Sequence, residues 1–475
     1  MSSDITSCCL SLLTLLGPKV SLPNTATYNT SLSTYFAQQN ALLHPSCIVH
    51  PSNTQDVSKA LQALTSLNQN QHCPFALRSG GHAYNTGFNN VEHGVTIDLS
   101  NLASISLSDD RDIVSIGTGA SWDDVYSLLD PLNLSVPGGR AAQVGVGGLT
   151  LGGGVSYFSP RYGWTCDSVA NFEIVLVDGS IVNANETHNP DLRIALCGGG
   201  NGNFGIVTRL DIRTFPQGAI WGGSVYYTLD TIEGQLKAFE KLSSADGYDD
   251  YASLITSLAF SASVGGAIVN SIIYTKEEEY PAVYGPFFEL PSLSSTVRIA
   301  PLGEIAREQG SFSPDGRRQA SATITHRSTL SILNATYTRW NTSLVSIKTI
   351  PGIVWSLSLE PLPPSIFARH ANTNSMGLSD ASQSLVVTQL SASWDDERDD
   401  EVVERAAREL IEGIEEDAKG LGGYEKYLYL NYAAVWQDPI GSYGRESVER
   451  LQRVQGEVDP NGVFRRAVKG FKIPV

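Results

Sequence analysis

The stretch RSGGHAYNTG, residues 78–87, follows an apolar run with the composition of a buried strand and places His82 directly after two glycines. Three interpretations fit these residues alone. His82 caps a surface corner, it is a core histidine bonded to backbone, or the glycines let the chain approach a ligand that His82 binds or attacks. The stretch by itself favours the first two interpretations, and only other parts of the sequence can distinguish among the three.

Two further glycine-rich loops lie in the same half of the chain, VGVGGLTLGGG at residues 144–154 and GGGNGNFGIVTRL at residues 198–210. The first lacks the Gly-Lys-Ser/Thr ending of a phosphate loop, and no helical pattern follows it as a Rossmann fold requires. Glycine loops leave backbone N–H groups free to bind an extended anion such as a pyrophosphate. Three such loops together predict a dinucleotide held outside a Rossmann fold.

The length and composition of the chain limit the classes of molecule that it is expected to bind. A chain of 475 residues exceeds one ordinary core, so we expect two domains. The formal net charge of −17 argues against nucleic acid and against anionic membrane surfaces. No apolar run approaches the ~20 residues of a transmembrane helix. The expected partner is a small molecule, and we expect a monomer.

The compartment is predicted from sequons and cysteines. Five N-x-S/T sequons favour a secretory or extracellular protein over a cytoplasmic one; they begin at Asn29, Asn133, Asn185, Asn334 and Asn341. The N-terminus carries no clear signal peptide, because its apolar stretch is preceded by the acidic Asp4 and by no basic residue. The apolar stretch is better explained as an amphipathic helix over residues 9–16. One disulfide from the Cys8–Cys9 pair to Cys47 or Cys73 fits a secretory protein, and six reduced, buried cysteines are the alternative.

The pattern of the sequence changes near residue 215. Before it, short β-rich runs alternate with glycine loops and two helical patterns, at residues 56–69 and 122–132. From 216 to 420, five runs predict strands of one antiparallel sheet with helices between them. The acidic stretch 395–420 has one apolar face, so we expect a helix with a solvated charged face. An aromatic-rich tail, residues 421–475, follows.

Several other chemistries are excluded by spacing. No G-x-S-x-G elbow with a matching acid and histidine is present. The histidines include no pair at helical spacing, and no C-x-x-C occurs, so we expect no metal site.

The motifs together resemble a known family. RSGGHAYNTG, PGGRAAQVGVGGLTLGGG, the NFGIVTR strand and the terminal YLNYAAVWQ look like those of berberine bridge enzyme-like proteins. That group belongs to the vanillyl-alcohol oxidase/p-cresol methylhydroxylase flavoproteins, and the likeness is strongest to fungal secondary-metabolite oxidases. The resemblance implies an α+β fold with a two-subdomain FAD-binding domain of the p-cresol methylhydroxylase type at 1–215. It also implies a substrate domain built on a large antiparallel sheet flanked by helices at 216–420, and a segment returning to the FAD-binding domain at 421–475.

The resemblance also implies which residues hold FAD. His82 occupies the position that is bonded covalently to the flavin, and Ala141 stands where many relatives have a second, cysteinyl link, so one link is expected. Val144 occupies a position where valine leaves the flavin open to O2 and leucine blocks it; packing of the turn is the alternative role. The full set of expected cofactor residues is Arg78, Ser79, Gly80, Gly81, His82, Gly138, Val144, Gly145, Gly147, Gly148, Leu151, Gly152, Gly153, Gly154, Gly205, Ile206, Val207 and Asn431.

Three residues compete for the catalytic steps. Tyr432 matches an active-site tyrosine of many relatives, but with a free pKa of ~10 it needs a nearby positive charge or hydrogen bonds to act as a base. Glu360 ends an apolar strand, where burial would raise its pKa toward neutrality and suit it to accept a proton; an exposed strand end is the alternative. Gln389 cannot be a base and is expected to orient the substrate. We rank Tyr432 before Glu360.

The expected activity is that of an FAD oxidase acting on an alcohol or an activated C–H or N–H of a small natural product, with O2 reduced to H2O2 and ring closure as a possible sequel. Two alternatives stay open. One is a carbohydrate or oligosaccharide oxidase, against which Ala141 argues mildly. The other is a redox-silent pericyclase that keeps FAD for structure.

Overall fold

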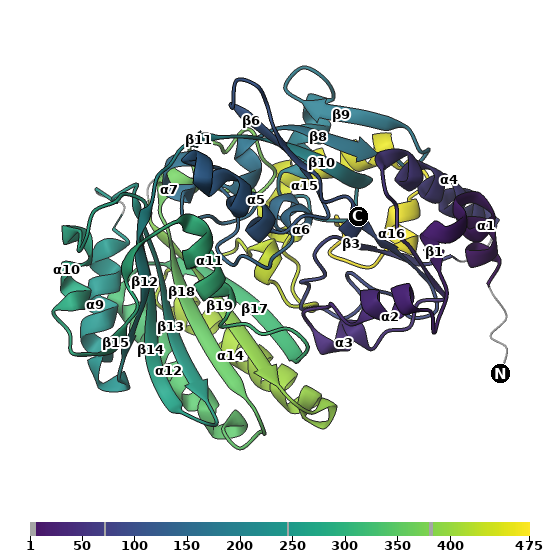
Figure 1. Ribbon diagram of the computed structural model, residues 1–475. Helices are drawn as coiled ribbons and strands as arrows, with labels where there is room; N and C mark the ends of the chain where they lie inside the picture. Colours follow the sequence, from purple (N-terminus) through teal and green to yellow (C-terminus); the bar gives the residue numbers. More distant parts are fainter. Residues whose placement is uncertain (1–5, 71–72, 245–246, 380–382) are drawn as a thin grey trace.

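The structure is a computed structural model that describes residues 6–70, 73–244, 247–379 and 383–475 (Figure 1). Three of its sheets lie in the N-terminal half and a fourth, much larger one in the C-terminal half. Figure 1 shows the large sheet beside the first three, with the C-terminal segment reaching back across to them. No helix of the described residues is long and apolar enough to cross a membrane.

The first sheet positions the RSGGH turn. Its order is β1 (Val20–Ser21), β2 (Cys47–Val49), β4 (Val95–Asp98) and β3 (Phe75–Arg78), with β2, β4 and β3 parallel. Helix α4 (Thr54–Asn70) covers the helical pattern expected at residues 56–69. Because β3 ends at Arg78, the turn that carries His82 leaves the carboxyl end of a parallel strand, which is where ligands bind in open α/β sheets.

The second sheet is antiparallel and carries the third glycine loop. Its order is β5 (Ile105–Leu107), β6 (Ile113–Gly117), β10 (Ile206–Arg213), β8 (Val169–Val175) and β9 (Ile181–Asn185). A two-stranded pair joins β7 (Leu134–Ser135) to β11 (Phe215–Pro216). The loop at residues 198–205 therefore feeds directly into the central strand, β10.

The large sheet has nine strands. Its path runs β15 (Ser292–Ser295), β12 (Ile220–Tyr227), β14 (Gly265–Tyr274), β13 (Ala252–Ser261), β18 (Val354–Leu362), β19 (Leu385–Trp394), β17 (Arg318–Arg327) and β20 (Tyr424–Glu425), and β16 (Arg298–Ala300) also pairs with β12. All pairings are antiparallel, which confirms the expected sheet. Sequence reasoning missed β17, where the apolar alternation is weak because it consists only of Ala320, Ala322 and Ile324 between polar residues.

Helices cover one face of this sheet. α9 (Ile232–Leu242), α12 (Leu330–Ile347) and α14 (Asp400–Gly420) pack side by side on it (Figure 1). α14 buries Val403, Leu410 and Ile414 and turns its acidic residues outward, as expected. The other face of the sheet is left to meet the N-terminal half.

The remaining helices pack around the sheets or lie within the connecting loops. They are α1 (Ser7–Leu16), α2 (Ala26–Leu32), α3 (Gln38–Ala41), α5 (Trp122–Leu129), α6 (Val146–Leu151), α7 (Ser159–Tyr162), α8 (Pro190–Leu196), α10 (Gly285–Phe288), α11 (Leu302–Gly310), α13 (Pro364–Phe367), α15 (Arg445–Val458) and α16 (Val463–Ala467). Helix α6 is a correction, because we expected no helix in the 144–154 loop. The apolar Val146, Leu149 and Leu151 among its glycines support a short one. In α1, Leu10 is exposed rather than part of the apolar face.

Two disulfides fasten α1, where we expected one. Cys8 is bonded to Cys73 and Cys9 to Cys47, while Cys166 and Cys197 are free and buried. The pairs tie α1 to β2 and to the residues just before β3. Neighbouring cysteines can reach two partners here because consecutive helical side chains point in different directions.

We expect Cys9→Ser with Cys47→Ser to lower the free energy of unfolding by roughly 2–4 kcal/mol, because the 38-residue separation closes a long loop of the unfolded chain. Thermal unfolding monitored by circular dichroism measures the loss. Cys166→Ser, which removes a free thiol, is the control for the loss of cysteine as such. An unchanged melting temperature in the double variant would contradict the role given to this disulfide.

Candidate active site

One cavity of about 520 Å³ lies between the open face of the large sheet and the glycine loops. Strands β13, β14, β18 and β19 contribute one wall, through Ser257, Ser271, Glu360 and Gln389 among others. The RSGGH turn, the loop before α6 and the C-terminal segment at residues 429–433 contribute the other. The cavity thus joins the three regions that the sequence motifs singled out.

The two glycine loops meet backbone to backbone. A Cβ atom on Gly80 would lie 2.6 Å from Gly145 Cα, and one on Gly145 would lie 2.5 Å from Gly80 N. The backbone N–H groups of Gly80, Gly81 and His82 donate no hydrogen bond to any residue that the structure describes. Three consecutive free N–H groups at the cavity wall form a site suited to phosphate oxygens.

The His82 ring is held by stacking, and one of its nitrogens is left free. The ring lies 3.9 Å from that of Phe36, at 9° to it, and its Nε2 has no partner among the described residues. Burial lowers the pKa of His82 to about 4. The imidazole is therefore neutral at physiological pH, and a neutral ring keeps the lone pair that a covalent bond to a cofactor would need.

These features fit FAD. A pyrophosphate would find free N–H groups on the turn, and an extended dinucleotide would find a long cavity in contact with a neutral histidine. Gly148 lines the same cavity, and a Cβ there would meet nothing within 4 Å, so the loop leaves open space beside it. Ala141 also lines the cavity, which places a methyl group where the second link of relatives would attach.

A buried polar cluster of Arg140, Glu360 and Tyr432 joins the two walls, because Glu360 comes from the large sheet and the other two residues come from the loop before α6 and the C-terminal segment. Arg140 Nη2 donates to Glu360 Oε2 at 2.8 Å and to Tyr432 Oη, and Tyr432 Oη donates to Glu360 Oε1 at 3.1 Å. Burial raises the pKa of Tyr432 well above its usual value, although the Arg140 charge opposes the rise. Tyr432 therefore rests as the neutral phenol, with its proton directed at a carboxylate.

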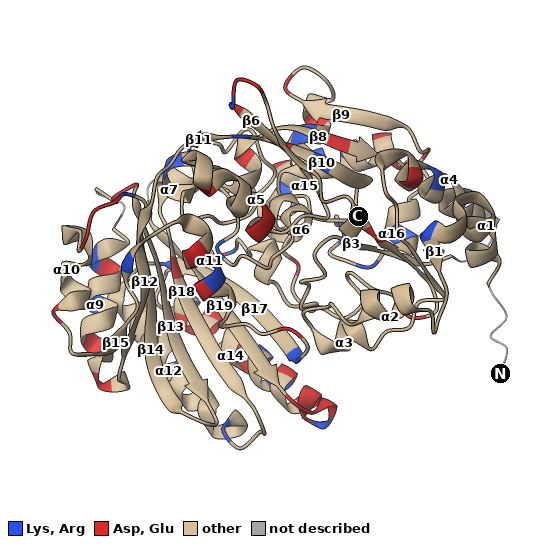
Figure 2. Ribbon diagram, viewed as in Figure 1, with Lys and Arg blue, Asp and Glu red and all other residues tan. Residues whose placement is uncertain are grey.

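Glu360 differs from its neighbours in the central strands of the large sheet because it is charged. It is the only charged residue in β12, β13, β14, β18 and β19, and Figure 2 shows these strands almost uniformly uncharged. Its side chain is only 6% exposed. The alternative interpretation, an exposed strand-end acid, is wrong. A lone buried acid beside an arginine is costly to retain for stability alone, so its position suggests a functional role.

The structure brings eleven of the 21 expected site residues to the cavity. Those that line it are Ser79, Gly80, Gly81, His82, Val144, Gly145, Gly148, Gln389, Glu360, Asn431 and Tyr432. Those that do not are Arg78, Gly138, Gly147, Leu151, Gly152, Gly153, Gly154, Gly205, Ile206 and Val207.

Arg78 points away from the cavity because its guanidinium is used inside the protein. Nη1 donates to Ser31 and to Asp98, Nη2 donates to Thr34, and the group stacks 4.1 Å from the Tyr35 ring centroid. These contacts hold the Arg78 side chain inside the protein, where it supports the turn. It does not face a cofactor.

The glycines outside the cavity have packing roles. A Cβ on Gly152 would lie 2.0 Å from Asn431 Oδ1, and one on Gly138 would lie 2.5 Å from the Trp122 ring. Gly153 and Gly154 have φ of 104° and 85°, which favours glycine. Residues 205–207 enter β10 and are buried against β8. Gly200 and Asn201 are the residues of the third loop that line the cavity.

Arg140 is the site residue that sequence reasoning missed. The signal was present, since it is the one charged residue in the stretch 131–154, which otherwise consists of apolar, glycine and small polar residues. A charge inside a glycine loop that also carries cofactor contacts is a functional candidate by the same argument as Glu360.

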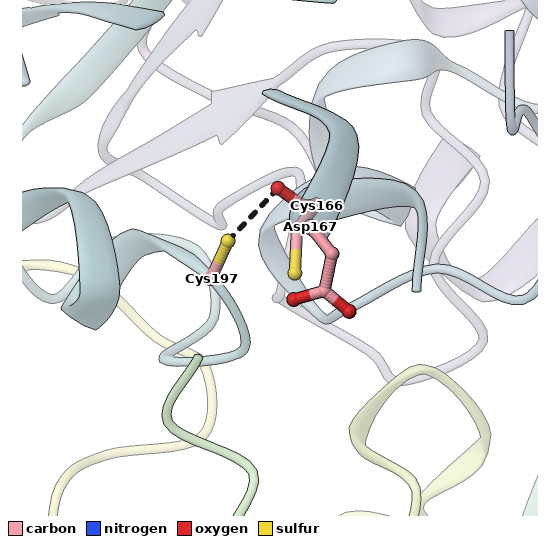
Figure 3. Close-up of side chains that lie close together, drawn as sticks. All are labelled: Cys166, Asp167 and Cys197. Atoms are coloured by element: carbon pink, nitrogen blue, oxygen red, sulfur yellow. Dashed lines mark hydrogen bonds between the residues drawn. The ribbon is translucent and has the colours of Figure 1, made fainter. Parts of the chain in front are cut away.

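A second cluster, Cys166, Asp167 and Cys197, has donor atoms within 4.8 Å of one another (Figure 3). Cys197 Sγ donates to the Cys166 carbonyl at 3.0 Å, and Asp167 accepts from Asn374 Nδ2 and Trp164 N. Burial raises the pKa of the Cys166 thiol well above its usual value and that of Asp167 to about 7. All three side chains are buried, and Cys197 and Asp167 already have hydrogen-bond partners in the protein, so we assign the cluster to packing behind the 152–154 loop.

Comparison with known proteins decides the family. Residues 45–185 match the FAD binding domain family. The FAD-dependent monooxygenase sdcF of Emericella nidulans is 38% identical over 476 residues, which cover 98% of this chain and 98% of that protein. The chain belongs to the same family of FAD-dependent oxidoreductases as sdcF.

Two further comparisons concern the sequence and the fold. Oligopeptidase PhomG' of Diaporthe leptostromiformis is 42% identical over 463 residues, but this chain spans only 36% of that protein's length. The structure of a berberine bridge enzyme variant in complex with (S)-reticuline superposes with a TM-score of 0.79 at 17% identity, covering 99% of each chain. The two-domain fold expected from the resemblance is therefore confirmed, and the protein is an FAD-dependent oxidoreductase.

We expect Gly80→Ala to lower the FAD content of the purified protein and to cost about 1–3 kcal/mol of stability, because the added methyl group drives the two loops apart. Absorbance of flavin relative to protein, together with thermal unfolding, measures both effects. Gly456→Ala in α15 is the matched control, since its Cβ would meet nothing within 4 Å. Full flavin content in Gly80→Ala would show that loop contact is not required.

Proposed function

We propose that this oxidoreductase is an oxidase whose FAD is bonded through His82 alone and that dehydrogenates an alcohol, or an activated C–H or N–H, of a small natural product. The observation that carries the proposal is the Arg140–Glu360–Tyr432 cluster on the cavity wall. When bound, FAD would supply the redox chemistry by accepting a hydride at N5 and passing the two electrons to O2, which leaves as H2O2. The protein has to bind the substrate and remove the accompanying proton.

Tyr432 and Glu360 work best as one base. A neutral phenol accepts a substrate proton at Oη only if it releases its own, and Glu360 Oε1 lies 3.1 Å away to receive it. The substrate O–H or N–H proton thus moves to Tyr432 while the tyrosine proton moves to Glu360. Tyr432 and Glu360, which the sequence offered as alternative bases, therefore act one after the other in a single proton transfer.

Gln389 and the serine-rich sheet face would orient the substrate. Gln389 Nε2 donates to Ser321 Oγ at 3.1 Å, which leaves the amide oxygen for other partners. Six serines of four strands also line the cavity: Ser257, Ser271, Ser356, Ser358, Ser391 and Ser393. Their hydroxyl groups suit an oxygen-rich substrate, and they are also the observation that keeps a carbohydrate oxidase as the second candidate.

Val144 lies on the cavity wall and is partly buried. Its small side chain supports access of O2 to the bound flavin, and this favours oxidase turnover. The names of relatives raise monooxygenation instead, in which one oxygen atom of O2 enters the product. The fate of the oxygen atoms distinguishes the two.

A secretory location is also proposed. The two disulfides require an oxidising compartment. Asn29, Asn133, Asn334 and Asn341 of the sequons are exposed, which leaves them accessible to glycosylation.

We expect the holoenzyme to show anaerobic bleaching of its flavin with one or more members of a panel of phenolic and benzylic alcohols, xylobiose and cellobiose. With 18O2 the active substrate should give one labelled H2O2 per product and no label in the product. Label in the organic product would replace the oxidase with a monooxygenase. Turnover with the sugars alone would select the second candidate, and turnover of a compound without flavin reduction would select the pericyclase.

We expect Tyr432→Phe and Glu360→Gln each to slow flavin reduction by ~10²–10⁴-fold, because either change breaks the proton transfer. Stopped-flow absorbance under anaerobic conditions measures this rate directly. Tyr280→Phe, at a tyrosine that is 61% exposed, is the control. Reduction at the wild-type rate in both site variants would remove the pair from the mechanism.

A further inference from the structure

Arg140 does more in this cavity than pair with Glu360. It comes from the loop between β7 and α6, its side chain is 10% exposed, and it lines the cavity together with Glu360 and Tyr432. A guanidinium carries five N–H donors in a fixed plane. How many of them are used decides what else it can bind.

Only one nitrogen of the guanidinium is engaged. Both side-chain hydrogen bonds of Arg140 leave from Nη2, to Glu360 and to Tyr432. Nε and Nη1 make no hydrogen bond to any residue within the described ranges, and neither atom is fully enclosed. Because the group is almost entirely removed from bulk water, donors without a protein acceptor are costly unless a ligand satisfies them.

The charges around the cavity favour an anionic acceptor. Its described lining carries two cations, Arg140 and Lys469, and one anion, Glu360, while His82 is neutral. Tyr157 and Tyr429 also lie near the guanidinium, and burial keeps both phenols neutral, since it raises their pKa values above the usual range. Glu360 occupies the Nη2 edge, so the remaining edges face ligand space without an opposing carboxylate.

Proton transfer strengthens this preference. When Glu360 takes a proton through Tyr432, it loses its charge, and Arg140 is left as an unpaired buried cation. A nearby oxygen that carries negative charge would then be stabilised most at the moment when the substrate loses its proton.

We propose that Arg140 determines substrate specificity by binding a negatively charged or readily ionised oxygen of the substrate, a carboxylate or the hydroxyl of a phenol or enol, beside the group that Tyr432 deprotonates. The proposal rests on the proposed function for the site it uses. It goes beyond that function by naming the chemical class of the substrate.

Ligand binding to the oxidised holoenzyme tests the proposal without turnover. Two matched pairs serve as probes, benzoate with benzamide and 4-cyanophenol with 4-cyanoanisole, and each is titrated against the visible spectrum of the flavin. We expect the acidic member of at least one pair to bind tenfold or more tightly than its neutral partner. Preference within the first pair identifies a carboxylate, and preference within the second a phenolic oxygen.

The variants separate the guanidinium from general charge. Arg140→Gln should bring the ratio within each pair close to one, and Arg140→Lys should keep part of it. Arg140→Gln with Glu360→Gln restores the wild-type cavity charge and should still lose the preference. Arg398→Gln, at an arginine whose side chain is 85% exposed, removes the same charge from the surface and should leave the ratio unchanged. Retained flavin absorbance shows that each variant is folded.

The proposal is overturned if the wild-type protein does not distinguish either pair, or if Arg140→Gln keeps the preference. These outcomes are independent of the oxidase assay. A protein that binds acidic probes through Arg140 but produces no H2O2 contradicts the proposed function and leaves the inference standing.

Discussion

The contact between Gly80 and Gly145 is the constraint on which the site depends. Two loops from different parts of the chain touch through backbone alone, and a single methyl group on either would enter the other. This closeness fixes the direction in which the turn leaves β3, and with it the place of His82 and the three free N–H groups. Gly152, Gly153 and Gly154 of the same loop make room for Asn431, Met376 and Thr165, respectively.

The large sheet places a single charged side chain in an otherwise uncharged wall of the cavity. β18 carries Glu360 near its end, and the five central strands carry no other charged residue. Arg140 reaches it from the first half of the chain and Tyr432 from the C-terminal segment, so the cluster forms only when three distant segments have folded together. We therefore infer that proton transfer and substrate recognition share this one cluster, whereas the contact between the RSGGH turn and the 144–154 loop holds the cofactor.

The sequence predicted the fold well where its signals were local. Glycine spacing identified the RSGGH turn and the 144–154 loop, and alternating apolar runs identified β12, β13, β14, β18 and β19. It failed where the signal depended on distant contacts. β17 contains Ser321 and Thr323, which are buried because the C-terminal segment and β19 supply their hydrogen-bond partners, the carbonyls of Tyr432 and Thr388. Arg78 was expected to face the cofactor, since nothing local reveals that Ser31, Thr34 and Asp98 take up its guanidinium.

The central claim is that one histidine, placed by this loop contact, anchors the flavin. Denaturing the holoenzyme in acid, digesting the precipitate and analysing the peptide that contains His82 by mass spectrometry tests it directly. We expect a yellow precipitate, a His82 peptide heavier by one flavin nucleotide, no other flavin peptide, and a colourless precipitate from His82→Ala. Flavin that stays in the supernatant of the wild-type protein, or flavin on a different peptide, would contradict it.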